Sequence, residues 1–220
     1  MNPLDIAKIA SIKRNAIDKL QNTKNEAYNR ANDLYSAKNA QEIVNKLNSE
    51  EREIVYNHPL DLFVTPPELA RQMVLLADIH IGQTILEPSA GTGRIAEAIK
   101  NAGFNSDCIE LNYRAAELLK SRGFNVECID FLECSKTYNR IIMNPPFSND
   151  IDHVKHAYDL LTDNGHVVAI MSEGVFFRND KKSVSFRLFL DEHGTSEILQ
   201  PGTFKTSGTQ VNARLVIIDK

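Results

Sequence analysis

The stretch that decides the fold reads Leu-Glu-Pro-Ser-Ala-Gly-Thr-Gly and spans residues 86–93. It follows an apolar run, 84–87, that predicts a strand, and it precedes a helical pattern over 94–101. Gly91 and Gly93 let the backbone turn tightly and approach a ligand without a Cβ clash. In an open parallel sheet, ligands bind outside the carboxyl ends of the strands. The stretch therefore predicts a nucleotide-like ligand at this turn.

Strand and helix patterns alternate around this turn. We expect helices over 68–77, 94–101, 114–121, 151–161 and 183–192, and strands over 84–87, 107–111, 126–129, 140–143, 166–171, 197–199 and 214–218. Strands separated by helices form βαβ units, which predicts an α/β fold with a doubly wound, mostly parallel, Rossmann-like sheet of about seven strands. Only a loop separates the last two strands, so we expect one of them to run antiparallel.

Residues 1–57 differ from the rest of the chain. They contain proline only at position 3 and no glycine, and their apolar residues recur at helical spacing. We therefore expect an N-terminal helical segment over 1–57 and a main domain over 58–220. The segment is interpreted either as a helical cap on the main domain or as an arm that binds a partner or substrate.

Composition excludes several classes of protein. The 220 residues are 42% hydrophobic and 25% charged, which is ordinary for a globular protein. The net charge of −4 argues against a strongly basic nucleic-acid coat, but not against a local basic patch. No apolar run reaches the roughly 18 residues that cross a bilayer, and the first residues lack the apolar core of a signal peptide. Three cysteines without a CxxC pair indicate reduced thiols in a cytoplasmic protein, and we assign no metal and no membrane partner.

Three acidic residues indicate which nucleotide binds. Glu110 ends a predicted strand 17 residues after Gly93, where its carboxylate can accept from both ribose hydroxyls. That spacing fits a nicotinamide dinucleotide as well as S-adenosylmethionine. Asp130 can accept from an adenine amine, with Phe131 beside it to pack on the purine. Glu87 would repel a pyrophosphate and attract an ammonium or sulfonium group, so the electrostatics favour S-adenosylmethionine.

A second turn, Asn144-Pro-Pro-Phe147, follows the apolar run 140–143. A residue before proline is held extended and proline fixes its own φ, so the Asn144 side-chain oxygen and the Pro145 carbonyl become two fixed acceptors. Hydrogen bonds from both N–H groups of a conjugated amine would localise its lone pair for attack on a sulfonium methyl group. Phe147 offers an apolar face beside them. The structural alternative is an ordinary Asn-Pro turn.

With these residues in place, the chain resembles the adenine-N6 DNA methyltransferases of the gamma motif order over roughly residues 60–218. Four motifs occur in the order of that family: Phe63–Pro67, Leu86–Gly93, Asp130-Phe131 and Asn144–Phe147. The resemblance implies a class I methyltransferase fold and S-adenosylmethionine as cofactor. It also implies methyl transfer to the exocyclic N6 amine of an adenine flipped out of DNA.

The resemblance assigns roles residue by residue. The catalytic residues are Asn144, Pro145, Pro146 and Phe147. The cofactor-binding residues are Thr65 for the methionine part, then Glu87, Pro88, Ser89, Ala90, Gly91, Gly93, Glu110, Leu111, Asp130, Phe131 and Asn144. Phe147 and Phe204 are expected to stack on the flipped base. For Phe204, in Gly-Thr-Phe-Lys at 202–205, a core phenylalanine in a loop is the alternative.

Contacts with DNA are expected at a group of cations after the predicted strand 166–171: Lys181, Lys182 and Arg187, with Arg178 nearby. A solvated helix face is the alternative. Restriction-type members of the family continue into a target-recognition domain, whereas this sequence stops at Lys220, just after its last strand. We therefore expect loops, the N-terminal segment, or a recognition or restriction subunit to read the DNA sequence.

Other functions stay open at this point. The same Asn-Pro-Pro-aromatic chemistry serves amines in ribosomal RNA and glutamine amides in proteins. A further possibility is a modification subunit that needs a partner for DNA recognition. The sequence alone gives neither the recognition site nor the oligomeric state.

Overall fold

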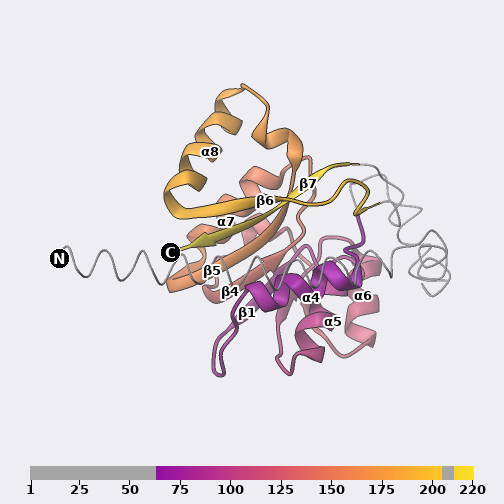
Figure 1. The fold of residues 1–220 in the computed structure, drawn as a ribbon. Helices are drawn as coiled ribbons and strands as arrows, with labels where there is room; N and C mark the ends of the chain where they lie inside the picture. Colours follow the sequence, from indigo (N-terminus) through magenta and orange to yellow (C-terminus); the bar gives the residue numbers. More distant parts are fainter. Residues whose placement is uncertain (1–62, 205–210) are drawn as a thin grey trace. The chain divides into compact units, whose positions relative to one another are not determined.

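The computed structural model describes residues 63–204 and 211–220 (Figure 1). The predicted segment 1–57, its boundary with the main domain, and position 205 of the predicted 202–205 motif lie outside the described residues. The helices are α4 (Pro67–Leu76), α5 (Arg94–Asn101), α6 (Tyr113–Ser121), α7 (Asp150–Asp159) and α8 (Lys181–His193), with 3-10 turns η1 (Phe131–Glu133) and η2 (Glu173–Phe176). The strands are β1 (Ile85–Pro88), β2 (Asp107–Ile109), β3 (Asn125–Glu127), β4 (Tyr138–Met143), β5 (Leu161–Ser172), β6 (Gly194–Ile198) and β7 (Ala213–Asp219).

The seven strands form one sheet in the order β3-β2-β1-β4-β5-β7-β6. Strands β1 to β5 pair in parallel, and β7 runs antiparallel between β5 and β6. The predicted doubly wound sheet with one reversed strand is therefore confirmed. The chain moves outward from β1 to β3 and then returns to the other side of β1 as β4. The carboxyl ends of β1 and β4 thus form the switch point at which such sheets bind ligands.

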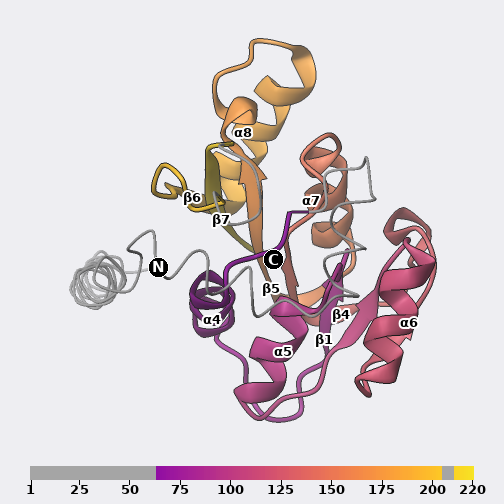
Figure 2. The ribbon, with the colours of Figure 1, turned by 90° about the vertical axis from the view of Figure 1, so that its right-hand side faces the viewer.

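Helices cover both faces of the sheet. Alternate residues of the central strands are therefore buried on opposite sides. Val167, Ala169 and Met171 of β5 pack in the cluster that contains apolar residues of α7 and α8. Val168 and Ile170 pack in the cluster that contains apolar residues of α4 and α5. Figure 2 shows α4 and α5 on one side of the strands and α7 and α8 on the other.

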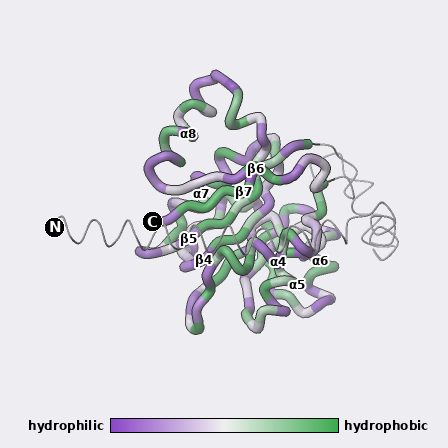
Figure 3. The backbone as a smooth tube through the Cα atoms, in the orientation of Figure 1, coloured by the Kyte–Doolittle hydropathy of each residue, from purple (hydrophilic) through white to green (hydrophobic). Residues whose placement is uncertain are grey.

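Hydropathy follows this layering. In Figure 3 the central strands β4 and β5 carry long hydrophobic stretches, in agreement with the burial of Ile141, Ile142 and Met143. None of the helices in the described part of the chain combines the length and apolar character that a membrane span requires. The cytoplasmic location inferred from the cysteines stays a prediction.

The helix starts are encoded locally. Pro67 occupies the first turn of α4, where its missing N–H is not needed. The side chains of Asn112 and Asp180 cap α6 and α8 by accepting from the backbone N–H three residues later. These caps set the direction in which each helix leaves the carboxyl edge of the sheet.

The expected helix over 151–161 and strand over 166–171 differ from the structure. Helix α7 ends at Asp159 and β5 begins at Leu161, five residues before the expected start. Leu161 pairs with Tyr138, and the register then shifts before Arg140 pairs with His166. Asn164 takes a left-handed φ of 59° in this irregularity. The Asn164-Gly165 pair is therefore a bend within a strand rather than the end of a helix.

Candidate functional site

A cavity of about 1160 Å³ opens at the carboxyl ends of β1, β2 and β4. Its lining includes most of the residues expected to bind the cofactor: Thr65, Glu87, Ser89, Ala90, Gly91, Glu110, Leu111, Asp130, Phe131 and Asn144. Pro146 of the expected catalytic turn lines it as well. Of the other expected residues, Pro88, Gly93, Pro145, Phe147 and Phe204 are not part of the lining.

The turn after β1 has the backbone that its glycines predict. Gly91 and Gly93 adopt left-handed φ values of 54° and 85°. Ser89 does so as well, at 66°, although it carries a side chain. A Cβ at Gly93 would lie 2.4 Å from a side-chain carbon of Leu119, so α5 and α6 pack closely at this point. The Gly93 amide closes the turn by donating to the Ala90 carbonyl at 2.8 Å. The loop is thus a fixed wall of the cavity.

Glu110 joins this loop to the end of β2. Its Oε2 accepts from the Gly91 amide at 2.6 Å and its Oε1 accepts from the Asn112 amide at 2.7 Å. A carboxylate has about four acceptor positions, so it can bind ribose hydroxyls in addition to these amides. Glu110 therefore holds the glycine loop and supplies acceptors to the cavity at the same time.

Glu87, the next-to-last residue of β1, differs from Glu110 in its hydrogen bonds. The side chain is fully buried, and its Oε2 has no hydrogen-bond partner among the described residues. Burial raises its pKa well above the ordinary value, and the nearby Glu110 adds to the rise, while the amides of Ala96 and Ile95 act against it. A buried acid at the wall of a cavity, with an unpartnered oxygen, is suited to a cation in that cavity.

The Asn144 side chain is clamped by the segment that precedes α4. Its Nδ2 donates to the Phe63 carbonyl at 3.0 Å and to the Thr65 hydroxyl at 3.1 Å. Since a carbonyl only accepts, these bonds fix which side of the amide carries the nitrogen. The opposite atom, Oδ1, is buried and has no partner within the described part of the chain. The bonds to Phe63 and Thr65 therefore orient Asn144 Oδ1 in the wall of the cavity.

Comparisons with known proteins agree with this architecture. No protein-family model matches the chain, and no curated protein matches its sequence. A type I restriction-modification methyltransferase subunit from Streptococcus thermophilus superposes with a TM-score of 0.65, at 19% identity, over 77% of this chain and 47% of that one. A putative class I S-adenosylmethionine-dependent methyltransferase from Listeria monocytogenes gives 0.59, at 12% identity, over 80% and 70%. A putative RNA methyltransferase from Pyrococcus horikoshii gives 0.55, at 19% identity, over 79% and 98%.

The fold is that of class I methyltransferases. This confirms the predicted fold class, and the cavity lies where this fold has its ligand site, at the switch point of the sheet. The chain spans about half the length of the Streptococcus subunit that it matches.

Phe147 and Phe204, both expected to stack on the flipped base, differ in their exposure. Phe147 is half-buried, with its ring centroid 5.2 Å from that of Phe63 and 6.1 Å from that of Phe204. Phe204 is 0% exposed and belongs to the core cluster beneath α4. Its expected role as a platform for the flipped base is thus not supported. The structure matches the alternative, a core phenylalanine in a loop, and Phe204 supports Phe147 edge-on.

Asp130 and Phe131 lie together at the end of β3. Asp130 Oδ1 caps η1 by accepting from the Leu132 amide at 3.0 Å. The Phe131 ring is buried against His153, with centroids 5.5 Å apart. His153 itself lines the cavity, a placement that the sequence analysis missed. Burial lowers the pKa of His153, which favours a neutral imidazole at this wall. Its only sequence signal is its position in the first turn of a helix that follows the Asn144 motif.

The expected DNA-contacting cations all lie on α8 but differ in their contacts. The Arg187 Nη1 donates to the carbonyls of Val175 and Arg178, so this guanidinium braces the loop before α8. Lys182 is half-exposed and pairs with Asp152 at 2.6 Å. Lys181 is exposed at the start of the helix. The three residues therefore do not form a single set of phosphate ligands, and Arg187 has a structural role.

Proposed function

We propose that this chain transfers a methyl group from S-adenosylmethionine to the exocyclic N6 amine of adenine in DNA. The observation that supports the proposal best is the Asn144 amide, held by Phe63 and Thr65. Its Oδ1, which has no partner in the described part of the chain, belongs to the same cavity as Glu87 and Glu110. Methylation of an amine by a sulfonium needs an acceptor that orients the amine and an acid that stabilises the cationic cofactor. Asn144 and Glu87 line the same cavity and can serve these two purposes.

The residues of the cavity fit this cofactor. Glu87 would face its cationic amino-acid end, because a buried carboxyl with an orphaned oxygen gains most from a nearby positive charge. Glu110 would accept from the ribose hydroxyls, and Asp130 from the adenine amine beside the Phe131 ring. Ser89, Ala90 and Gly91 would contact the cofactor where it lies along the glycine loop. The bound cofactor supplies a methyl group on a positively charged sulfur.

Catalysis then depends on positioning by the protein. Asn144 Oδ1 and the Pro145 carbonyl would accept the two N–H groups of the target amine and localise its lone pair on nitrogen. The amine nitrogen held by Asn144 and Pro145 would take the methyl group from the bound cofactor as the N–C bond forms, and would then release its extra proton to water. Phe147 would pack against the target ring. No strong base is required before attack, since the proton leaves an already cationic nitrogen.

DNA as the substrate is supported by the similarity to a type I restriction-modification methyltransferase subunit and by the four ordered motifs. That similarity also supports a second form of the proposal, a modification subunit that acts with a recognition partner. RNA is the other candidate, because a putative RNA methyltransferase shares the fold over 79% of this chain.

The test supplies labelled cofactor and one acceptor at a time to the purified chain. The acceptors are DNA that lacks N6-methyladenine, ribosomal RNA, and release-factor protein. Digestion of each acceptor then identifies the labelled product. We expect label in N6-methyladenine from DNA and none after Asn144→Ala, whose cofactor binding is checked by calorimetry. Label in RNA or in glutamine would assign a different substrate. Cofactor binding without label in any acceptor would favour the partner-dependent form.

A further inference from the structure

A phenylalanine at the carboxyl edge of the sheet is largely exposed, and the contact described for its ring is with the Arg214 guanidinium, 5.9 Å from the ring centre. Phe177 is 67% exposed and follows η2 directly, at the carboxyl end of β5. Exposing an aromatic ring forgoes the stabilisation that its burial would give. The backbone on each side of it is nevertheless held in place, so its exposure is part of the fold.

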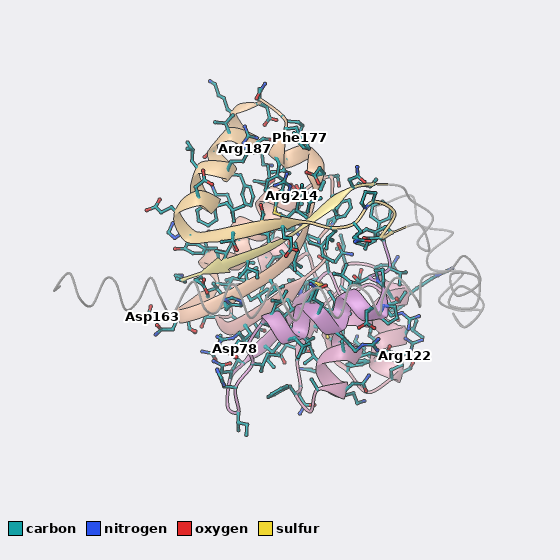
Figure 4. The ribbon with its side chains drawn as sticks, in the orientation of Figure 1. Asp78, Arg122, Asp163, Phe177, Arg187 and Arg214 are labelled. Carbon is teal, nitrogen blue, oxygen red and sulfur yellow. The ribbon has the colours of Figure 1, made fainter. Side chains whose placement is uncertain are left out.

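Two arginines fix this loop. Arg187 donates from Nη1 to the carbonyls of Val175 at 2.7 Å and Arg178 at 2.8 Å, which lie on either side of Phe177. Arg214 pairs with Glu173 at 2.8 Å and lies 4.3 Å from the centre of the Phe176 ring. Figure 4 labels Phe177, Arg187 and Arg214, which lie near one another in the upper part of the view. Phe177 is therefore a ring on a rigid support.

This support adjoins the turn that carries Asn144. Asp150 Oδ2 accepts from the Ser172 amide at 2.9 Å and its hydroxyl at 2.7 Å, which ties the start of α7 to the end of β5. A second cavity of about 250 Å³ lies between these elements, lined by Ser148, Asn149, Asp150, Ile151, Arg178, Asp180, Lys182 and Ser183. Ser148 and Asn149 line the main cavity as well. The exposed ring is thus one residue from a cavity that shares a wall with the candidate active site.

The charged side chains around the second cavity differ in exposure. Asp150 is 2% exposed and accepts from Ser172, while Asp180 caps α8 by accepting from the amide and hydroxyl of Ser183. The side chains of Arg178, Lys182 and Asp180 are 56%, 50% and 52% exposed, so these three groups lie at the solvent edge of the cavity. The ion pairs of the two cations with Asp180 and Asp152 are solvent-exposed, and such pairs contribute little. These cations can therefore exchange a carboxylate for a phosphate.

We infer that Phe177 stacks on an unpaired base beside the target adenine while Arg178 and Lys182 bind the phosphates of the same DNA strand. This rests on the proposed function and names the surface that holds the strand next to the active site. An exposed ring flanked by cations is the combination with which proteins bind single-stranded nucleic acid. It also replaces Phe204, which is buried, as the second aromatic residue of the substrate site.

Tryptophan fluorescence tests the stacking directly, because the chain contains no tryptophan. Phe177→Trp and, as the matched control, Leu188→Trp place one fluorophore each at positions that are both 67% exposed. A single-stranded adenine-containing oligodeoxynucleotide should quench the fluorescence of Phe177→Trp but not that of Leu188→Trp. Inorganic polyphosphate, which has charge but no bases, should quench neither. Equal quenching of both variants, or of neither, by the oligodeoxynucleotide would overturn the inference.

Two further variants separate stacking from charge. Phe177→Ala should weaken oligodeoxynucleotide binding about 5- to 150-fold, the range for one base–aromatic stack. Arg178→Gln should lower the salt dependence of binding by about 0.7 log units per log unit of salt, since it removes one single-strand phosphate contact. Both should bind the cofactor as the parent chain does. Methylation of DNA with unchanged binding in Phe177→Ala would reject the inference and leave the proposed function intact. Label in RNA or in protein glutamine, with none in DNA, would reject the proposed function itself.

Discussion

The candidate active-site cavity has two walls whose polar groups are satisfied to different degrees. On the wall formed by the ends of β2 and β3, Glu110 accepts from two backbone amides and Asp130 accepts from one. On the wall formed by the ends of β1 and β4, Glu87 Oε2 and Asn144 Oδ1 have no partner among the described residues. Backbone amides therefore hold the acids of the β2–β3 wall in place, whereas the β1–β4 wall keeps two buried oxygen atoms without a partner among the described residues.

This difference follows from the chemistry proposed for each wall. Ribose and adenine are neutral and need acceptors held in a fixed geometry, which backbone amides supply. A sulfonium and an amine that loses its proton need uncompensated negative potential, which a buried acceptor without a partner supplies. The following variants test this difference, from the largest expected effect to the smallest.

Replacing Asn144 should have the largest effect. Asn144→Ala removes the oriented Oδ1 acceptor from the β1–β4 wall, and loss of one preorganised group of this kind costs about a hundred- to a thousandfold in kcat. Single-turnover transfer of labelled methyl groups measures it. Cofactor affinity should change little, because the cofactor is bound mainly by other residues. A variant that keeps its kcat would remove Asn144 from the reaction.

Glu110→Ala should act on stability instead. It leaves the Gly91 and Asn112 amides without their acceptor, and hydrogen bonds to charged groups contribute about 1.5–3 kcal/mol each. We expect the free energy of unfolding to fall by about 3 kcal/mol or more in urea titrations, together with a loss of cofactor affinity. Glu117→Ala, which removes an exposed pair with Lys120, is the control and should cost under about 1 kcal/mol. Equal losses in the two variants would contradict the loop-holding role.

The pH dependence of cofactor binding should report Glu87. Burial raises its pKa, so Glu87 keeps its proton to a higher pH than an exposed carboxyl does, and a bound cation would favour the carboxylate. Affinity should therefore rise with pH, by up to about tenfold per pH unit, until the pH passes the raised pKa. Glu87→Gln should remove this dependence, which calorimetry at several pH values can follow. A Glu87→Gln variant with the parent's pH profile would exclude Glu87 as its source.

Stability should show the opposite trend with pH. The folded state binds more protons at Glu87 than the unfolded chain, because burial raises the pKa in the folded state alone. The contribution of Glu87 to stability is therefore full below the ordinary carboxyl pKa and declines as pH rises toward the raised value. In denaturant titrations, the difference between the parent chain and Glu87→Gln should move in this direction. A difference that does not vary with pH would contradict a Glu87 pKa raised by burial.

Thr65 should give the smallest effect on the reaction. Thr65→Val keeps the shape but removes the hydroxyl that accepts from Asn144 Nδ2, while the Phe63 carbonyl remains. The lost hydrogen bond contributes about 1 kcal/mol to the orientation of the Asn144 amide, so its removal would lower kcat about fivefold. Thr65→Ser should restore kcat, and the KM for DNA should stay constant in both variants. A loss of kcat that serine does not rescue would indicate a packing role.

Sequence patterns predicted the sheet and its turns well because these depend on local chemistry. Helix α5 has the predicted bounds, since Gly93 must precede it and Ala102 follows with no further apolar periodicity. The two prolines also predicted a fixed Asn144 side chain, whose role as an acceptor stays a proposal. The contacts that hold the amide were not predicted, because Phe63 and Thr65 are about 80 positions away in the chain and only the folded sheet brings them together.

Three-dimensional packing decided the cases that the sequence analysis missed. The motif around Phe204 does not encode whether its ring is buried, and the ring lies beneath α4. Arg187 has the charge expected of a DNA contact, but two carbonyls of a preceding loop bind it. Phe177 carries no distinguishing pattern at all. Its exposure results from the loop that Arg187 and Arg214 hold.

The most direct test of the central claim is the detection of N6-methyladenine by mass spectrometry in DNA incubated with cofactor and either the parent chain or Asn144→Ala. The two proteins must first show matching affinity for the cofactor. A methylated base with the parent chain alone is the predicted result, because only that chain retains the oriented acceptor at the β1–β4 wall. Equal yields of the methylated base from both proteins would contradict the account.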